Sequence, residues 1–298
     1  MMDISVIILT YNEELHIKRC IENIKNIASK IFVIDSNSTD NTATIAESLG
    51  ATVIQHKWPG NQAEQFNWAL ENVDIKTEWV LRLDADEYLL PELINEIENK
   101  LPTLEKDITG ITFKRRHTFM GRWIKRGTYP VMILRMFRKG KAICEQRLMD
   151  EHIELLEGKS ITFENDFVDH NLNNISWWAE KHINYAVREA AELIDIEHNI
   201  TKKNYNKRNL SRNTLQKRLM KHKYAKQPIF WRSFAYFCYR YFFRLGFLEG
   251  KEGFMWHFMQ GWWYRTMVDA KIFEIKRECK NDKEKIVKYL KENYNITL

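Results

Sequence analysis

Cysteine, proline and glycine are scarce in this chain of 298 residues. It has four cysteines, five prolines and eleven glycines. The cysteines lie far apart and form no C-x-x-C pair, which argues against a structural zinc site and suits a reducing cytoplasm. So little proline and glycine predicts regular secondary structure joined by short loops. The cysteines are Cys20, Cys144, Cys238 and Cys279.

Long uncharged apolar runs and two common nucleotide-binding motifs are also missing. No window of about 18 apolar residues is free of charge, so we expect no segment that spans a bilayer. The first residues run straight into an apolar segment without a charged region and cleavage site, so we expect no signal peptide. Neither G-x-G-x-x-G nor G-K-[ST] occurs, which weighs against a dinucleotide oxidoreductase and a P-loop NTPase.

Acidic residues are absent from one long stretch. Between Glu197 and Glu249 there is no Asp or Glu, whereas thirteen Lys and Arg occur. The formal net charge of the chain is +6, so the rest of it carries about −7 once this stretch is set aside. A basic, aromatic segment attached to a mildly acidic body indicates a surface that meets an anionic partner.

The first 90 residues alternate apolar runs with segments of helical periodicity. Continuous apolar runs are typical of buried parallel strands, and apolar residues three and four apart are typical of helices. The order β-α-β-α-β-α-β with short links predicts an α/β fold with a parallel, doubly wound sheet. The predicted strands are 4–10, 30–35, 51–55 and 79–83, and the predicted helices begin near 17, 42 and 61.

Carboxylates follow several of these strands. Asp84 and Asp86 end the strand that begins at Trp79, and Asp35 ends the second strand. Ligands of open α/β sheets bind at the carboxyl ends of the strands. Two carboxylates there could hold a divalent cation that clamps a diphosphate, and a loop entering a helix could donate to phosphate. A solvated acidic turn is the alternative for the Asp84 segment.

Three segments together resemble the family 2 glycosyltransferases with the GT-A fold. They are SVIILTYNEE (5–14), VIDSNSTDNT (33–42) and LRLDADE (81–87). The resemblance is closest to the bacterial branch that builds lipopolysaccharide core and capsular or other surface glycans. It implies a Rossmann-like, mostly parallel sheet and an inverting hexosyl- or N-acetylhexosaminyltransferase. The donor would be a nucleotide-sugar, often UDP-linked, used with Mn2+ or Mg2+.

The resemblance also assigns roles to the donor-side residues. Asp84 would approach the ribose or diphosphate, and Asp86 would bind the metal. A late histidine, His170, would complete the metal shell or touch the diphosphate, with an ordinary capping or core histidine as the alternative. The residues that would hold the nucleotide are Thr10, Tyr11, Glu13 and Asp35.

Inversion at an anomeric carbon requires a base that takes the proton of the acceptor hydroxyl. Relatives carry an acidic residue for this after an Arg-x-Phe strand. This chain has Asp150 and Glu151 there, so both stay candidates and Glu151 is favoured. By family analogy the acceptor side includes Trp123, which either stacks on a sugar or packs under a loop, with Arg126 and Arg135.

The composition changes near Thr201, where a basic tract begins, followed by two aromatic segments. We expect domains at 1–172 (GT-A, catalytic) and 173–298 (helical). At 100° per residue, Arg232, Arg240 and Arg244 share one face of a helix. This predicts an interfacial anchor on an anionic cytoplasmic leaflet, and so a cytoplasmic protein peripheral to the inner face of the cell membrane.

The alternative for this region is a helical hairpin packed on the catalytic body or on a second subunit, so a homo-oligomer is possible. We also expect a helix capped by Ser176 and one charged amphipathic helix over residues 271–298. The acceptor would be a glycan or a lipid-linked glycan.

Other functions compete with sugar transfer. A pI near 8.9 and interleaved aromatic and Arg residues fit a nucleic-acid binder, but that leaves the three motifs unexplained, and we expect no nucleic-acid partner. A nucleotidyltransferase that makes the activated sugar would need a glycine-rich basic loop after the first strand, where this chain has Tyr-Asn-Glu-Glu. A pseudoenzyme that only anchors to membrane is a further alternative.

Overall fold

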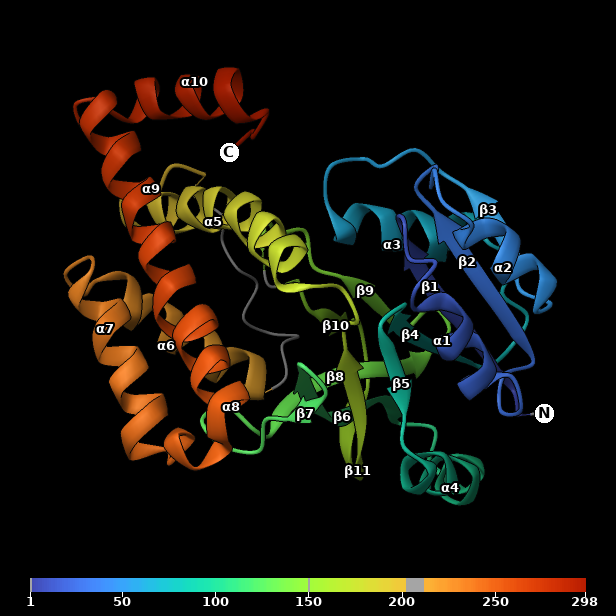
Figure 1. Ribbon diagram of the computed structural model, residues 1–298. Helices are drawn as coiled ribbons and strands as arrows, with labels where there is room; N and C mark the ends of the chain where they lie inside the picture. The colour runs from blue at the N-terminus through green and yellow to red at the C-terminus, as the bar shows by residue number, and fades with distance from the viewer. Residues whose placement is uncertain (1, 150, 202–211) are drawn as a thin grey trace. The chain divides into compact units, whose positions relative to one another are not determined.

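The computed structural model describes residues 2–149, 151–201 and 212–298, which form two compact units (Figure 1). The first unit is built from residues 2–125 and 129–172, and the second from 126–128, 173–201 and 212–298. Asp150 and residues 202–211 of the basic tract lie outside the described residues.

The first unit contains a 9-stranded mixed sheet. Its parallel half has the order β3-β2-β1-β4, and β8 then pairs antiparallel with β4. Beyond β8 follow β6, β11 and β5, with β7 beside β6, and β9 and β10 form a separate pair. The strands are β1 (Ile4–Thr10), β2 (Lys30–Asp35), β3 (Thr52–Gln55), β4 (Trp79–Asp84), β5 (Glu87–Leu89), β6 (Ile108–Phe119), β7 (Arg122–Trp123), β8 (Val131–Arg138), β9 (Ala142–Cys144), β10 (Ile153–Leu155) and β11 (Lys159–His170).

Helices cover both faces of the parallel half, which explains the continuous apolar runs. In β1, Val6 and Ile8 pack with the apolar stripe of α1, whereas Ile7 packs with Phe66 and Ala69 of α3 on the other face. A strand buried on both faces has no polar side to alternate. The predicted α/β fold, with helices on both faces of a mostly parallel half of the sheet, is confirmed. The helices of this unit are α1 (Ile17–Ile24), α2 (Thr42–Ser48), α3 (Gln62–Asn72), α4 (Pro91–Lys100) and the short η1 (Leu101–Thr103).

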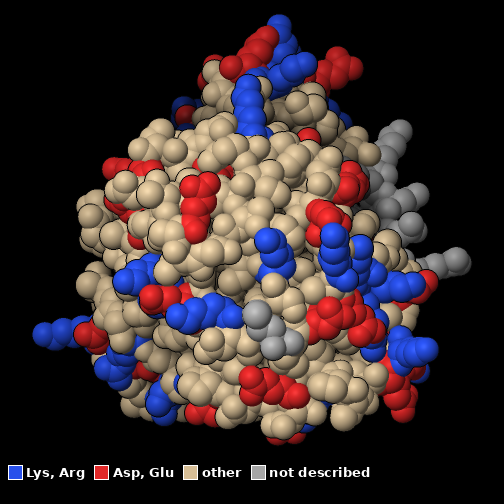
Figure 2. All heavy atoms as spheres, turned by 90° about the vertical axis from the view of Figure 1, so that its right-hand side faces the viewer, with Lys and Arg blue, Asp and Glu red and all other residues tan. Residues whose placement is uncertain are grey.

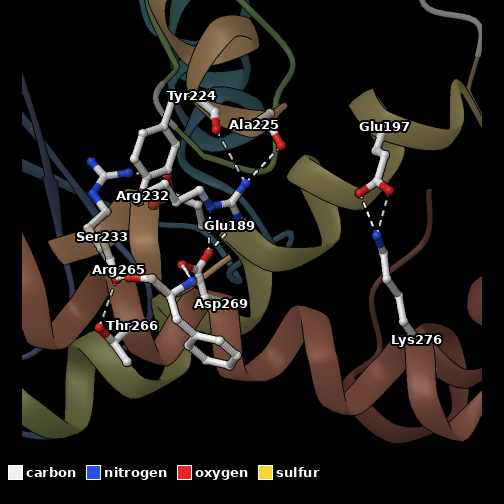
Figure 3. A network of polar contacts seen from close by, with 11 residues as sticks. Glu189, Glu197, Tyr224, Ala225, Arg232, Ser233, Arg265, Thr266, Asp269 and Lys276 are labelled. Atoms are coloured by element: carbon white, nitrogen blue, oxygen red, sulfur yellow. Dashed lines mark hydrogen bonds and ion pairs between the residues drawn. The ribbon is translucent and has the colours of Figure 1, made fainter. Parts of the chain in front are cut away.

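The second unit is helical in its described residues, and buried ion pairs fasten its helices (Figure 3). Arg232 donates from Nε to Asp269 at 2.8 Å, and Arg265 donates to Glu189 at 2.8 Å. The helices are α5 (Ile175–His198), α6 (Arg212–Ala225), α7 (Trp231–Cys238), η2 (Tyr239–Phe243), η3 (Gly246–Glu249), α8 (Gly250–Trp256), η4 (His257–Trp263), α9 (Tyr264–Glu278) and α10 (Lys283–Tyr294). None of these helices combines the length and the apolar character needed to cross a bilayer.

Two predicted helix boundaries in this unit are wrong. The cap of α5 is Asn174, whose side chain accepts from the N–H of Trp177 at 3.0 Å, so Ser176 lies inside the helix. The expected single helix over 271–298 is two, because Lys280 and Asn281 adopt positive φ and Asp282 caps α10. Residues with positive φ end a right-handed helix.

Charge is mixed on the face of the molecule shown in Figure 2. Lys and Arg side chains alternate there with Asp and Glu, and among the residues drawn in colour no large area carries one sign. An anionic surface or polymer would therefore find no extended basic patch on this face.

Candidate active site

The loops that follow β1 and β2 are fastened to each other. The N–H of Asn12 donates to Ser38 Oγ at 2.8 Å, and Asn12 Oδ1 accepts from the N–H of Thr39 at 2.8 Å. The N–H of Glu13 donates to Thr42 Oγ1 at 2.7 Å. Asn12 has φ 56, a conformation that Asn tolerates better than most residues. The two loops thus form one rigid rim at the carboxyl ends of their strands.

The side chain of Asp35 accepts hydrogen bonds from the residues at the base of this rim. Its Oδ1 accepts from Thr10 Oγ1 at 2.8 Å, and its Oδ2 accepts from the N–H of Ser38 at 2.8 Å. Asp35 is fully buried, whereas the neighbouring Tyr11 is 59% exposed. The structure therefore brings Thr10 and Asp35 together as predicted neighbours, and it leaves Tyr11 open at the surface. Their part in nucleotide binding stays a prediction.

Glu13 is oriented by a buried histidine. His16 Nε2 lies 2.8 Å from the N–H of Leu172, and His16 Nδ1 lies 2.6 Å from Glu13 Oε2. An amide N–H can only donate, so Nε2 accepts and the ring proton sits on Nδ1, where it is donated to Glu13. This relay ties the rim to the end of β11. A histidine at helical spacing after Tyr-Asn-Glu-Glu is the only local signal for it, and no sequence pattern links it to Leu172.

Asp84 shares an arginine with Glu87. Arg135 Nη2 donates to Asp84 Oδ2 at 3.1 Å and also to Glu87 Oε1, and Glu87 Oε2 accepts from the N–H of Asp84 at 3.0 Å. Burial alone would raise the pKa of Asp84, but the guanidinium groups of Arg135 and Arg82 outweigh it and lower this pKa. Burial, with the charges of Asp84 and Asp169, raises the pKa of Glu87.

The position of Arg135 corrects the sequence prediction. It was expected on the acceptor side, but its side chain is only 6% exposed and lies against Asp84 and Glu87. The physical reason is that the buried Glu87 and the partly exposed Asp84 beside it require a cation, and β8 carries Arg135 alongside β4 to meet them.

Asp86 is the carboxylate at this strand end whose charge is least compensated. Its Oδ2 accepts from Asn171 Nδ2 at 2.9 Å, and no Lys or Arg side chain of the described residues pairs with it. Burial and the charges of Asp169 and Asp84 raise the pKa of Asp86 to about 6. A divalent cation would relieve this repulsion, and carboxylate oxygen is the ligand that Mg2+ and Mn2+ prefer.

His170 lies beside Asp86 and is held by Arg19. The N–H of His170 donates to the carbonyl of Asp86 at 3.0 Å, and Arg19 Nη2 donates to the carbonyls of both, at 2.6 Å for His170 and 3.1 Å for Asp86. Arg19 Nη1 lies 3.3 Å from His170 Nδ1. Burial and Arg19 lower the pKa of His170. Since arginine only donates, Nδ1 accepts and the proton of the neutral ring lies on Nε2.

The residues of this strand end fit a metal bound jointly with substrate. In the described parts of the chain, no three His, Cys, Asp or Glu side chains form a preformed metal cage. Mg2+ in nucleotide-dependent enzymes is commonly held by one or two carboxylates, phosphate oxygens and water. Asp86 suits that arrangement. His170, as the tautomer above, presents a donor from Nε2, which matches a phosphate oxygen better than a metal.

Cys144 links the strand end at Asp84 to the segment of the base candidate Glu151. Arg82 Nη1 donates to Cys144 Sγ at 3.3 Å, and its Nη2 lies 3.9 Å from Asp84 Oδ1. Burial raises the pKa of Cys144, Arg82 opposes this, and the nearby charge of Glu151 adds to the rise. Glu151 therefore lies within electrostatic reach of Cys144, which accepts from Arg82. Asp150 lies outside the described residues.

The remaining acceptor-side candidates, Trp123 and Arg126, belong to different units of the structure. Trp123 is packed, because the guanidinium carbon of Arg116 lies 3.9 Å and the Lys125 ammonium 4.8 Å from its ring centroid. Arg126 belongs to the second unit, where its Nη1 lies 3.6 Å from Glu249 Oε1. The structure thus supports packing as the role of Trp123 in the free protein.

Comparisons with known proteins point in one direction. A family model described as glycosyl transferase family 2 matches residues 5–154. A Rickettsia bellii protein described as a glycosyltransferase is 45% identical over 95 residues, which cover 32% of this chain and 31% of that protein. The lipopolysaccharide core biosynthesis glycosyltransferase LpsC of Rhizobium meliloti is 30% identical over 153 residues, covering 47% of this chain and 52% of LpsC.

Among solved structures, a similar one is glucosyl-3-phosphoglycerate synthase from Mycobacterium tuberculosis in complex with Mn2+ and UDP. It is 25% identical, covers 39% of this chain and 44% of that chain, and has a TM-score of 0.32. The chain therefore spans about a third to a half of the length of the relatives it matches.

Proposed function

This chain belongs to glycosyl transferase family 2 and is a glycosyltransferase, and from that premise we propose a specific reaction. It transfers a hexose or N-acetylhexosamine, with inversion, from a UDP-linked donor to an acceptor that is a surface glycan or its lipid-linked precursor. The similarity to a lipopolysaccharide core glycosyltransferase supports that class of acceptor.

One observation carries the proposal. Three parallel strand ends bring the Thr10–Glu13 loop, Asp35 and the Asp84–Asp86 pair to one edge of the sheet, since Thr10 pairs with Asp35 and Leu9 with Asp84 in register. Ligands of open α/β sheets bind at this edge. A nucleotide there would meet the fastened loops with its base and ribose, and Asp84 and Asp86 with its diphosphate.

Asp86, with Asp84 beside it, would hold the divalent metal, whose chemistry is to neutralise negative charge on the departing nucleoside diphosphate. Arg135 keeps Asp84 ionised and fixed in place. Arg19 keeps His170 neutral, so that its Nε2–H can donate to a phosphate oxygen. Glu151, or Asp150 next to it, would take the proton from the acceptor hydroxyl.

The test is a thermal-shift screen of UDP-, GDP- and dTDP-sugars, each with and without Mn2+. We expect a UDP-sugar with Mn2+ to raise the melting temperature most, because ligands that bind only the folded state stabilise it. Asp86→Asn should abolish the part of the shift that depends on Mn2+. As a matched control, Asp74→Asn changes an exposed carboxylate that pairs only with exposed Lys76 and should leave the shift unchanged. A shift of equal size without metal would contradict the metal-dependent mechanism.

A further inference from the structure

The turn that joins η2 to α8 carries an exposed apolar cluster, which we call the apolar tip. It consists of five side chains within residues 242–248, each between 46% and 78% exposed: Phe242, Phe243, Leu245, Phe247 and Leu248. The tip joins the two orange helices α7 and α8 in Figure 1. Monomeric soluble proteins seldom expose so many large apolar side chains together, and such patches mark interaction sites.

Ring contacts continue from the tip along the helices that flank it. The ring of Tyr241 lies 5.2 Å from Phe242, 6.3 Å from Phe247 and 5.7 Å from Phe254, measured between centroids. The series of ring contacts then runs through Phe254, Phe258, Trp262 and Phe234, of which Phe254 and Phe234 are exposed. The tip is therefore the exposed end of one connected group of aromatic side chains.

Polar side chains of the same helices point inward, which corrects the sequence prediction. Arg232, Arg240 and Arg244 were expected on one outward face, but only Arg244 is exposed. Arg240 is fully buried and donates to Gln260, and Arg232 donates to Asp269 as Figure 3 shows. Arg232 and Arg240 therefore share one face, but it points inward, and the π-helix Tyr239–Phe243 widens the turn so that Arg244 leaves that face.

This distribution, with charged groups inside and aromatic groups outside, suits a surface that faces an apolar phase. Exposing five large apolar side chains to water is unfavourable, and their transfer to an apolar phase would be favourable. The flanking helices are too short to cross a bilayer, so burial of the tip in lipid would be confined to the interfacial layer.

The charge around the tip identifies the kind of lipid. Arg244 and Lys251 are exposed beside it, Glu249 is only 2% exposed, and the sequence has no Asp or Glu from 198 to 248. Cations at the headgroup level are attracted to anionic lipids. A second copy docked tip to tip across a two-fold axis would bring like charges together, which disfavours a dimer through this surface.

We propose that the apolar tip inserts Phe242, Phe243, Leu245, Phe247 and Leu248 into the interfacial layer of an anionic bilayer, with Arg244 and Lys251 at the phosphate level. This site is separate from the strand-end site and does not depend on the proposed reaction. It would hold the enzyme at the surface where a lipid-linked acceptor is found.

The test is flotation of the full chain with vesicles of phosphatidylcholine, with and without phosphatidylglycerol. We expect the chain to float with the anionic vesicles and much less with the neutral ones. The double variant Phe242→Ser with Phe243→Ser should lower the partition coefficient at least about tenfold, given the transfer free energy of two aromatic side chains. Arg244→Gln should weaken binding to anionic vesicles only.

Phe273→Ser is the matched control, because Phe273 is 48% exposed on α9 outside the tip, and it should bind as the unchanged chain does. Circular dichroism melting and the Mn2+-dependent donor shift check that every variant is folded and that the strand-end site is intact. The proposal is overturned if the chain does not float, if the double variant floats equally well, or if sedimentation velocity shows a dimer that the double variant abolishes.

Discussion

Arg135 Nη2 lies 3.1 Å from Asp84 Oδ2, although 51 residues separate the two in the chain. The same nitrogen donates to Glu87, so one guanidinium serves two carboxylates, and Arg82 Nη2 lies 3.9 Å from Asp84 on its other side. Asp86, the next carboxylate along the chain, has no Lys or Arg partner among the described side chains. This uncompensated carboxylate makes the strand end receptive to a divalent metal, and Arg135 holds the neighbouring Asp84 in place.

Replacing Arg135 with Met should destabilise the fold. The change leaves the buried Glu87 without its cation and removes one of the two cations beside Asp84, and removing one partner of a buried ion pair typically costs about 3–5 kcal/mol. Urea unfolding followed by circular dichroism would measure the free energy of unfolding. Lys106→Met, at an exposed position before β6, should cost less than about 0.5 kcal/mol. Equal values for the two variants would show that the Arg135 contacts contribute little.

Asp86 should make the stability of the metal-free protein depend on pH. The pKa of its carboxyl is raised from 3.8 to about 6 in the folded state by burial and by the charges of Asp169 and Asp84. A raised pKa favours the protonated folded state, so this contribution is fully present below the unfolded pKa and is lost as pH rises through about 6. Urea unfolding of the chain and of Asp86→Asn across this pH range, without metal, would isolate it.

The free energy of unfolding of the unchanged chain and that of Asp86→Asn should differ by an amount that changes as pH rises through about 6. Asp86→Asn should become the relatively more stable protein as pH rises, because it carries no charge at this position. Mn2+ competes with the proton for the carboxylate, so the stabilisation by Mn2+ should weaken below pH about 6. A difference that stays flat with pH would show that Asp86 is ionised throughout.

His16 should act as a positioning residue for Glu13. His16→Ala removes the donor that orients the Glu13 carboxylate, so we expect the KM for the donor sugar to rise about tenfold with a smaller change in kcat, as loss of one charged hydrogen bond implies. His16→Asn keeps a donor near the position of Nδ1 and should restore part of the KM. In the background of Glu13→Gln, His16→Ala should have little further effect.

Lys18→Ala changes an exposed residue of α1 and serves as the control for these kinetics. If His16→Asn is no better than His16→Ala, or if the two substitutions add fully, His16 supports the fold without orienting Glu13.

Glu151 should act in transfer and not in donor binding. Glu151→Gln keeps the shape of the side chain but cannot take a proton, so we expect an unchanged donor-induced thermal shift and a loss of transfer of about 100-fold or more. Asp150→Asn provides the comparison within the same segment. The assignment is wrong if Asp150→Asn loses transfer while Glu151→Gln stays active.

Local pattern was enough to predict the first half of the fold. Strand β1 was predicted with its observed bounds, because a strand covered by helices on both faces must be apolar at every position. Asp84 and Asp86 were predicted as site residues for a similar reason, since carboxylates directly after an apolar run mark the end of a buried strand. The spacing of apolar and acidic residues along the chain predicts which residues are buried and where a strand ends, because both are local properties.

Tertiary structure alone decided which partners these residues have. Arg135 meets Asp84 because β8 lies antiparallel beside β4, and His16 meets the N–H of Leu172 across 156 residues. Arg244 leaves the inward face of Arg232 and Arg240 because the π-helix Tyr239–Phe243 shifts the register between them. Each of these contacts depends on strand pairing or helix winding far from the residue itself. The periodicity of one segment therefore does not predict these contacts. The strands, and the carboxylates that end them, could be predicted from the sequence.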